Sequence, residues 1–440
     1  MNGCDSKFPV CAVTGGEHHH FFGYYDKCPW DYTGRYLLAL ETDLAARMPT
    51  PDDRATVGVV DLFEGNRWCP IGETTAWNWQ QGCMLQWLGD GPTSEIIYND
   101  RCDGDLVSVV QNTVTGKRRI LPHAVSAVSR SGTHALCASF ARLVDTRPGY
   151  GYVGAVDPWR GELSPDEDGI FLMDVVTGES RMVISLAQIA ALRPEASMAG
   201  AKHWVNHLLF TPDGRRFLFL HRWIRCHEGR RPVGILDAPP PLVSALAGAL
   251  RRARNATEGG PFGRIVFGAL GFVWRRVRVA HSTRMLSASV QGTDVHCFRT
   301  TELVSHFDWM DSHAVLAYAG VPGVGQGYYL FEDESDAVRQ VGEGVLSWDG
   351  HCSFSPDRRW LLVDSYPDDD KNMQRMSVFN LSRAALVEIG GFRSLPPFRG
   401  DLRCDLHPRW SRDGSRICFD STHEGQRQVY IVDVRDAVSG

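Results

Sequence analysis

The sequence lacks the features that mark several common classes of protein. Its 12 cysteines include no CxxC pair and no set with the spacing of zinc ligands. No apolar run approaches the roughly 20 residues that a membrane-spanning helix needs. Residues 1–13 also lack the basic and then apolar segments of a secretory leader. We therefore expect free thiols, a reducing compartment and a cytoplasmic location.

The signatures of several enzyme classes are missing as well. The chain has no GxSxG nucleophile elbow, no P-loop and no HExxH motif, which argues against serine hydrolases, nucleotide hydrolases and zinc peptidases. Its net charge of −6 argues against a general nucleic-acid binder, because such proteins neutralise phosphates with a basic surface. The remaining classes are proteins whose functional site is assembled by the fold and is not marked by a short sequence motif.

One short pattern is present seven times, and in each copy a polar turn rich in Asp and Gly joins two apolar runs. Such a pattern predicts a β-hairpin. The seven turns lie at residues 30–34, 87–90, 128–132, 210–214, 307–311, 354–357 and 410–414. A second series of apolar runs follows these turns, at residues 57–61, 106–110, 170–174, 285–289, 328–331, 376–380 and 429–433.

Two hairpins per unit, at a spacing of roughly 40–50 residues, are typical of the four-stranded blades of a β-propeller. The sequence thus predicts an all-β protein, a seven-bladed β-propeller that occupies residues 1–440 as one domain. The alternative is an all-β sandwich whose hairpins resemble one another by chance, which the regular spacing disfavours.

Two insertions interrupt the repeat. The first, at about residues 142–168, splits the third blade, and its Tyr150, Tyr152 and Trp159 are candidates to line one mouth of the ring. The second, at about 222–283, splits the fourth blade and carries arginines among apolar residues over 242–278. This pattern predicts a basic helical insertion, either a surface lid or a peripheral contact with a membrane or a protein.

Histidines recur in phase with the predicted turns. His207, His351 and His407 each precede the turn aspartate by six residues, and His306 precedes its own by five. We expect these four side chains to converge on the channel, where imidazoles suit metal binding or proton transfer. Asp405, two residues before His407, points the same way in an extended strand.

Further candidates lie at the start of the first two blades. His20 has a place related to that of the four histidines, and Trp79, Gln80 and Gln81 lead into the second blade. Tyr24, Tyr25 and Trp79 have aromatic faces on which sugars can stack. We assign His20, Tyr24, Tyr25, Trp79, Gln80 and Gln81 to substrate binding.

At these histidines the chain resembles the oligogalacturonate lyase family, seven-bladed propellers with repeats of the TolB/PD40 type. The stretch that begins at His20 and continues through Tyr24 and Tyr25 resembles that family's first-blade entry. His351 resembles its sixth-blade metal histidine. Asp405-Leu406-His407-Pro408 falls where the family has His-Pro-His-Pro, with Asp405 in place of one histidine. The family's glutamine ligand falls near Leu402.

The resemblance implies a divalent metal held by His351, Asp405 and His407, with manganese expected and calcium or zinc as alternatives. It also implies that Arg284 is the catalytic arginine, acting as a base or as a carboxylate clamp. His207, His221 and His306 fall at family histidine positions, and His207 and His306 are the alternative acid and base.

The function predicted from this resemblance is that of a carbon–oxygen lyase that cleaves uronate-containing oligosaccharides by β-elimination. An acidic oligosaccharide is then the substrate, and no nucleic acid is involved. Two alternatives stay open: a non-enzymatic glycan-binding or assembly propeller, and a propeller glycosidase that depends on a histidine at the same face.

Overall fold

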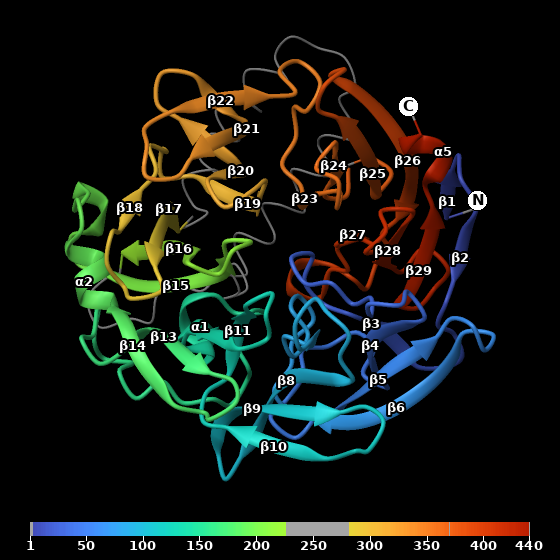
Figure 1. Cartoon of the computed structure of the whole chain (residues 1–440), viewed down its shortest axis with the longest axis horizontal. Helices are drawn as coiled ribbons and strands as arrows, with labels where there is room; N and C mark the ends of the chain where they lie inside the picture. The colour runs from blue at the N-terminus through green and yellow to red at the C-terminus, as the bar shows by residue number, and fades with distance from the viewer. Residues whose placement is uncertain (1–2, 226–280, 369, 440) are drawn as a thin grey trace, which may run out of the picture.

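The computed structural model describes residues 3–225, 281–368 and 370–439. Within these residues the strands form seven antiparallel sheets arranged in a ring around a central channel (Figure 1). This arrangement confirms the predicted seven-bladed β-propeller. The predicted helical insertion over 242–278 lies outside the described residues.

In each blade the strands follow one another outwards from the channel. Blades 1 to 3 consist of β3 (His19–Phe21), β4 (Tyr36–Thr42), β5 (Ala55–Asp61) and β6 (Arg67–Thr74); β7 (Gln86–Trp87), β8 (Glu95–Cys102), β9 (Asp105–Asn112) and β10 (Arg118–Leu121); β11 (Val125–Val128), β12 (His134–Cys137), β13 (Gly169–Asp174) and β14 (Ser180–Ser185).

Blades 4 to 6 repeat the same order. They consist of β15 (Ala201–Phe210), β16 (Arg216–Arg225), β17 (Ser282–Ser289) and β18 (His296–Cys297); β19 (Val304–Trp309), β20 (Ala314–Val321), β21 (Gly325–Glu332) and β22 (Val338–Val341); β23 (Cys352–Phe354), β24 (Trp360–Asp364), β25 (Met373–Asn380) and β26 (Ala385–Arg393). The short helices are α1 (Phe140–Thr146), α2 (Leu186–Ala191), α5 (Arg435–Val438), η1 (Ala196–Met198) and η2 (Gly400–Leu402).

The first residues of the chain close the ring. Blade 7 has β27 (Arg409–Trp410), β28 (Arg416–Ser421) and β29 (Gln428–Asp433), and its outer strand is β2 (Val10–Ala12) from the N-terminal segment. β1 (Cys4–Ser6) adds a fifth strand to blade 6 by pairing with β26. The two termini therefore lie side by side (Figure 1), and backbone hydrogen bonds from one end of the chain to the other hold the ring shut.

The repeated turns share one local geometry. In blade 7 the Ser411 hydroxyl donates to Asp413 at 2.5 Å, and Gly414 follows with a φ of +72°. Thr211, Asp213 and Gly214 repeat this arrangement in blade 4. A glycine at the last position avoids the steric cost that a side chain meets in the left-handed region. The Asp-Gly signature of the sequence is thus a turn signature.

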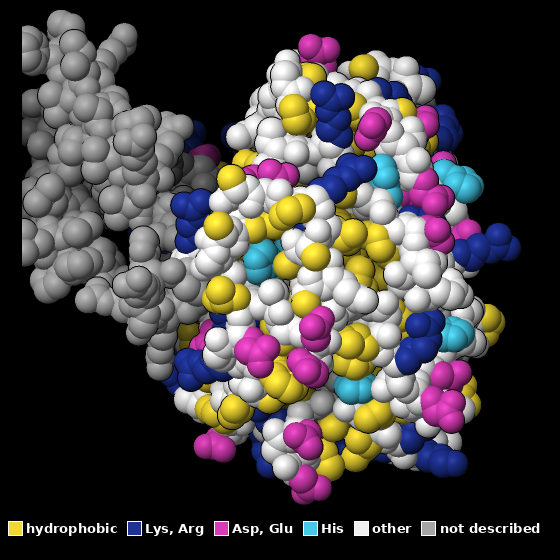
Figure 2. Space-filling model, turned by 90° about the vertical axis from the view of Figure 1, so that its left-hand side faces the viewer, with side chains coloured by type: hydrophobic (Ala, Val, Ile, Leu, Met, Phe, Trp, Pro, Cys, Tyr) yellow, Lys and Arg dark blue, Asp and Glu magenta, His cyan; other side chains and the backbone are white. Residues whose placement is uncertain are grey.

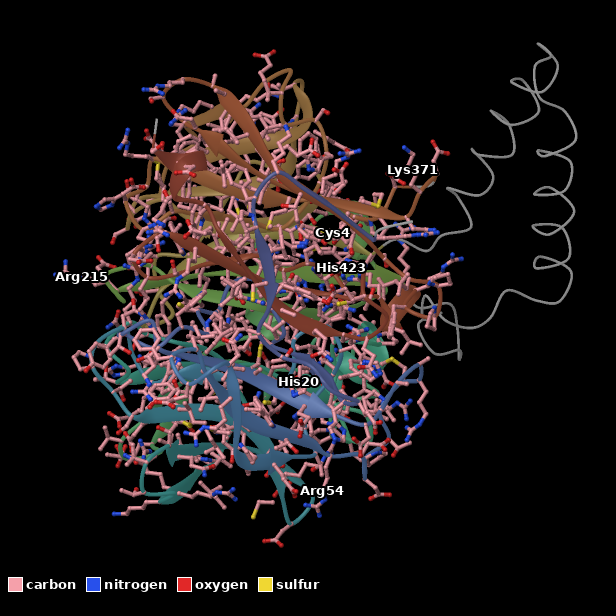
Figure 3. The ribbon with its side chains drawn as sticks, turned by 90° about the vertical axis from the view of Figure 1, so that its right-hand side faces the viewer. Cys4, His20, Arg54, Arg215, Lys371 and His423 are labelled. Atoms are coloured by element: carbon pink, nitrogen blue, oxygen red, sulfur yellow. The ribbon has the colours of Figure 1, made fainter. Side chains whose placement is uncertain are left out.

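The two faces of the ring differ in which connections they carry. Arg215, in the turn between the first and second strands of blade 4, lies at one face, and Lys371, between β24 and β25, lies at the other (Figure 3). The insertion that follows β12, which holds α1, is on the Lys371 side because it joins a second strand to a third. This insertion, and the connections that lead into β23 and β27, supply Arg147, His351, Asp405 and His407 to the candidate site.

One side of the rim shows mixed charges. On the side of α2 and β14, basic, acidic and apolar side chains are intermixed (Figure 2). In the part of the chain that the structure describes, no helix has the length and apolarity to cross a membrane.

Candidate functional site

Four histidines from blades 4 to 7 meet in the channel. The ring centres of His306 and His351 are 4.2 Å apart, and those of His351 and His407 are also 4.2 Å apart. His207 joins them through Tyr24, whose ring stacks on His207 at 4.8 Å and meets His407 edge-on at 5.1 Å. All five side chains are buried. The structure therefore brings together the four histidines that the spacing placed in phase.

Irregular backbone geometry orients two of these side chains. The pairing of β15 with β16 shifts register between Asn206 and Leu209, and His207 lies in this bulge with a φ of +52°. The pairing of β19 with β20 shifts between Val304 and Phe307, around His306. A β-bulge bends a strand and re-aims a side chain, and bulges are common next to functional sites. His207 pays a steric cost in the left-handed region that regular pairing would have avoided.

The loop after β3 crosses the channel and supplies Tyr24 and Tyr25. Arg409 pairs with Asp420 at 3.0 Å and donates to the Gly23 and Tyr24 carbonyl oxygens, so a buried ion pair holds the loop. Gly23 has a φ of +128°, and a Cβ there would lie 2.7 Å from the carbonyl carbon of Gln81. Only glycine fits this crossing. It places both tyrosine rings against the histidines.

His351, Asp405 and His407 form a buried group whose ligand atoms all lie within 4.8 Å of one another. His351 Nε2, His407 Nε2 and Asp405 Oδ1 are buried and have no hydrogen-bond partner. Buried polar atoms are almost always bonded, so three potential ligand atoms without a hydrogen-bond partner in one such group fit the binding of a cation. His351 Nδ1 bonds Asp364 at 2.9 Å, which leaves Nε2 free, as in carboxylate–histidine–metal arrangements.

The protonation states fit a metal site. Burial lowers the pKa of His351 and of His407 well below the usual value, so both imidazoles are neutral at neutral pH. Neutral imidazole is the form that binds metal ions. Asp405 Oδ2 accepts from Arg403 Nε at 2.6 Å, which fixes the carboxylate, and Oδ1 has no hydrogen-bond partner.

A cationic cluster lies beside the histidines. Arg222 and Arg147 both donate to His281 Nε2, at 2.7 and 3.2 Å. Burial, and then the charge of Arg147, lowers the pKa of Arg222 to about 9. Burial first, and Arg222 and Arg147 next, lower the pKa of His207. The charges of the two arginines therefore lower the pKa of at least one histidine of the site, His207.

Tyr150 lies between the arginines and the group of His351, Asp405 and His407. The Arg147 guanidinium lies 4.5 Å from the centre of the Tyr150 ring, and Arg403 donates to the Tyr150 hydroxyl at 3.1 Å. Arg403 in turn holds Asp405. Burial alone would raise the pKa of Tyr150, but Arg403 and Arg147 outweigh it and lower this pKa.

Arg284 and His221 lie outside this site, in contrast to the sequence interpretation. Arg284 Nε donates to His221 Nδ1 at 3.0 Å, and its other nitrogens donate to the Ile189 and Arg193 carbonyl oxygens at the end of α2. Residues 221 and 222 are neighbours on β16, so their side chains point to opposite faces of the blade. His221 pairs across the sheet with Arg284 and shares its face, while Arg222 faces the histidines.

The predicted substrate-binding residues are divided among several places. Tyr24 and Tyr25 lie against the histidines. Trp79 is part of the apolar core of blades 1 and 2, and Gln81 is buried in the turn that Gly23 touches. Gln80 donates to the carbonyl oxygens of Asp401 and Arg403, beside the site.

His20 and Leu402 have structural surroundings of their own. His20 bonds Glu41 at 3.0 Å and Gln428 at 3.1 Å, at the seam between blades 1 and 7 on the side where the termini meet (Figure 3). Leu402 packs against the core of blades 1 and 2, so its side chain cannot act as the glutamine ligand that the resemblance implied near this position.

The sequence interpretation missed Arg222, Arg147, His281 and Arg403. Arg222 had a recognisable signal, because alternation along β16 separates it from His221. Arg147 belongs to an insertion without periodicity, and nothing in the sequence relates it to His281.

No family model and no curated protein matches the chain in sequence. In structure, it is similar to an oligogalacturonate lyase in complex with manganese, with a TM-score of 0.63 and 14% identity over 100% of this chain and 96% of that one. It is also similar to the oligogalacturonate lyase of Vibrio parahaemolyticus, with a TM-score of 0.60 and 14% identity over 99% and 97%. The chain therefore has the fold of the oligogalacturonate lyases, a seven-bladed β-propeller that aligns over its full length.

Proposed function

We propose that this propeller is a lyase that cleaves uronate-containing oligosaccharides by β-elimination. The observation that carries the proposal is the buried group of His351, Asp405 and His407, in which three potential ligand atoms have no hydrogen-bond partner. The full-length likeness to a lyase that binds manganese supports it.

His351, Asp405 and His407 are the residues that would hold the metal. Two imidazole nitrogens and one carboxylate oxygen suit manganese and also zinc. A divalent cation bound there supplies charge stabilisation to a substrate carboxylate, which makes the neighbouring C–H bond more acidic. The remaining chemistry belongs to side chains of the chain itself.

Arg222 is our candidate for the base. β-Elimination breaks the C5–H and C4–O bonds and forms a C4–C5 double bond; the leaving oxygen takes a proton from water or from an acidic side chain. A guanidine with its usual pKa is almost never neutral, whereas the pKa of about 9 at Arg222 gives a neutral fraction of about 1% at pH 7. Tyr24 and Tyr25, which lie against the histidines, are the aromatic side chains that would contact the sugar.

The test is formation of unsaturated uronate, measured by its ultraviolet absorbance, from oligogalacturonate in the presence of manganese. Arg222→Ala should reduce turnover at least a hundredfold, the size typical of losing a group that acts on the reacting charge. Arg54→Ala, an exposed arginine of the rim that pairs with Glu73, is the matched control and should leave turnover unchanged. Absence of product from a panel of uronate oligosaccharides would exclude the lyase.

Binding without catalysis is the second candidate. It is favoured by the incomplete ligand set, because Leu402 turns into the core and Asp405 stands where a histidine is expected. Affinity for uronates without product would support it.

A further inference from the structure

A second cavity lies outside the candidate site. It has a volume of about 260 Å³ and lies between the turn that joins β8 to β9 and the insertion that follows β12. Phe171, on the third strand of blade 3, forms part of its wall, so the cavity is displaced outwards from the channel. Among the described residues that line it, none belongs to the candidate site. The cavity is therefore a separate place where a ligand can bind.

Asp168 provides this cavity with a buried carboxylate oxygen that has no partner. Asp168 lines the cavity and is only 7% exposed. Its Oδ1 accepts from the Gly169 backbone N–H at 2.8 Å, whereas its Oδ2 is buried without a hydrogen-bond partner. Because buried polar atoms are almost always bonded, Oδ2 fits a donor that a ligand supplies.

The cation that acts on Asp168 within the fold is Arg142, and its donors are used elsewhere. Burial raises the pKa of Asp168 to about 6, and the charge of Arg142 only partly offsets this effect. All three guanidinium nitrogens of Arg142 already donate, to Asp157 and to the carbonyl oxygens of His203, Trp159, Glu162 and Leu163. Arg142 therefore balances Asp157 and leaves Asp168 without a direct partner.

The rest of the lining favours a positively charged ligand. The aromatic side chains of the wall are Phe140, Trp159 and Phe171. His123 stacks on Phe171 with ring centres 5.1 Å apart, and burial lowers its pKa, so this imidazole is neutral at neutral pH. Asp105 and Glu167, both exposed, add two further carboxylates. Among the described residues of the lining, none is a lysine or an arginine. Aromatic faces and carboxylates both attract cations.

We propose that this cavity binds a small organic cation, a primary alkylammonium whose charged group bonds Asp168 and whose carbon chain lies against Trp159 and Phe171. A bond between an ammonium and a carboxylate is about twice as strong as a bond between neutral groups. The exposed Glu167 and Asp105 favour a second ammonium group, so a diamine should bind more tightly than a monoamine. The site is independent of the proposed lyase activity.

Calorimetry at pH 8, where Asp168 is ionised, tests the site with putrescine, a four-carbon diamine, and with butanediol, the neutral diol of the same length. Putrescine should bind, and butanediol should bind at least tenfold more weakly. Asp168→Asn should weaken putrescine binding about tenfold or more, the size of one lost charge-assisted bond. Asp5→Asn, at an exposed position on the edge of blade 6, removes the same charge and should bind as wild type does. Absence of saturable putrescine binding, or equal affinity in Asp168→Asn, would overturn the proposal.

Two substitutions of Trp159 test the aromatic wall. Trp159→Leu keeps an apolar side chain and removes the aromatic face, so it should weaken putrescine binding about threefold or more. Trp159→Phe keeps an aromatic face and should bind more tightly than the leucine variant. Wild-type affinity in both variants would contradict the placement of the ligand against this ring.

Thermal unfolding separates a binding role of Asp168 from a structural one. At pH 8 Asp168→Asn removes a buried charge without a direct partner, so its melting temperature should equal or exceed that of wild type. Putrescine should raise the melting temperature of wild type and of Asp5→Asn, and should leave that of Asp168→Asn unchanged. A large fall in the melting temperature of Asp168→Asn would make Asp168 a structural residue and overturn the proposal.

Discussion

Turnover should rise steeply with pH if Arg222 is the base. Burial and the neighbouring Arg147 lower the pKa of Arg222 from 12.5 to about 9. At pH 7 about one guanidine in a hundred is then neutral, compared with about three in a million at the ordinary value. Deprotonation of Arg222 is therefore easier by about 5 kcal/mol than that of an ordinary arginine.

The expected profile follows from the free enzyme, which kcat/KM reports. A base must lose its proton before it can act, so kcat/KM should increase about tenfold per pH unit from pH 6 and level off near pH 9. Removing Arg147 withdraws a charge that lowers the pKa of Arg222. The plateau of Arg147→Gln should therefore move to higher pH.

Initial rates of unsaturated uronate formation, taken between pH 6 and 10 in saturating manganese, check both statements. The Arg54→Gln variant should follow the wild-type curve, since its charge is exposed at the rim. A profile that is flat or falls between pH 7 and 9 would refute the role of Arg222. The same holds if Arg147→Gln lowers the rate without moving the plateau.

Three further results are expected. His351→Ala should lose most of its manganese affinity in calorimetry, whereas His20→Ala, which removes an equally buried histidine outside the group, should keep it. Arg284→Ala should lower the melting temperature by freeing the end of α2 and leaving His221 Nδ1 without its partner, while the folded fraction stays active. Burial raises the pKa of Asp168 to about 6 from 3.8, so the folded state favours the protonated carboxyl. The contribution of this group to stability is therefore fully present below about pH 4 and is lost as the pH rises through 6. Asp168→Asn should therefore gain about 3 kcal/mol over wild type in urea unfolding between pH 4 and 8, and an equal difference at all pH values would contradict the raised pKa.

The blades could be predicted because their signals are local. An Asp-Gly turn and two apolar runs fit within some twenty residues, and each blade repeats them. The convergence of His207, His351 and His407 also followed from local spacing, since equal distances from equivalent turns give equal heights in the channel. The bulge at His207 was not visible in the sequence, yet it preserves this convergence.

The arginines could not be placed in the same way. Arg284 resembles the family's catalytic arginine by its neighbours in sequence, but the register of β16 with β17 places it on the face of His221. Arg222 is one residue away from His221 and faces the opposite side. A shift of one residue reverses every side chain on a strand, so an alignment at this level of similarity does not decide between them.

Arg147 and its partner His281 are 134 positions apart in the chain, and their meeting depends on how the insertion after β12 folds back. The N-cap Ser139 starts α1, and the fully bonded Arg142 fixes this helix to blade 4. Neither interaction has a sequence signature strong enough to predict a contact across blades. Long-range placement of an insertion is therefore the part of the site that only the structure provides.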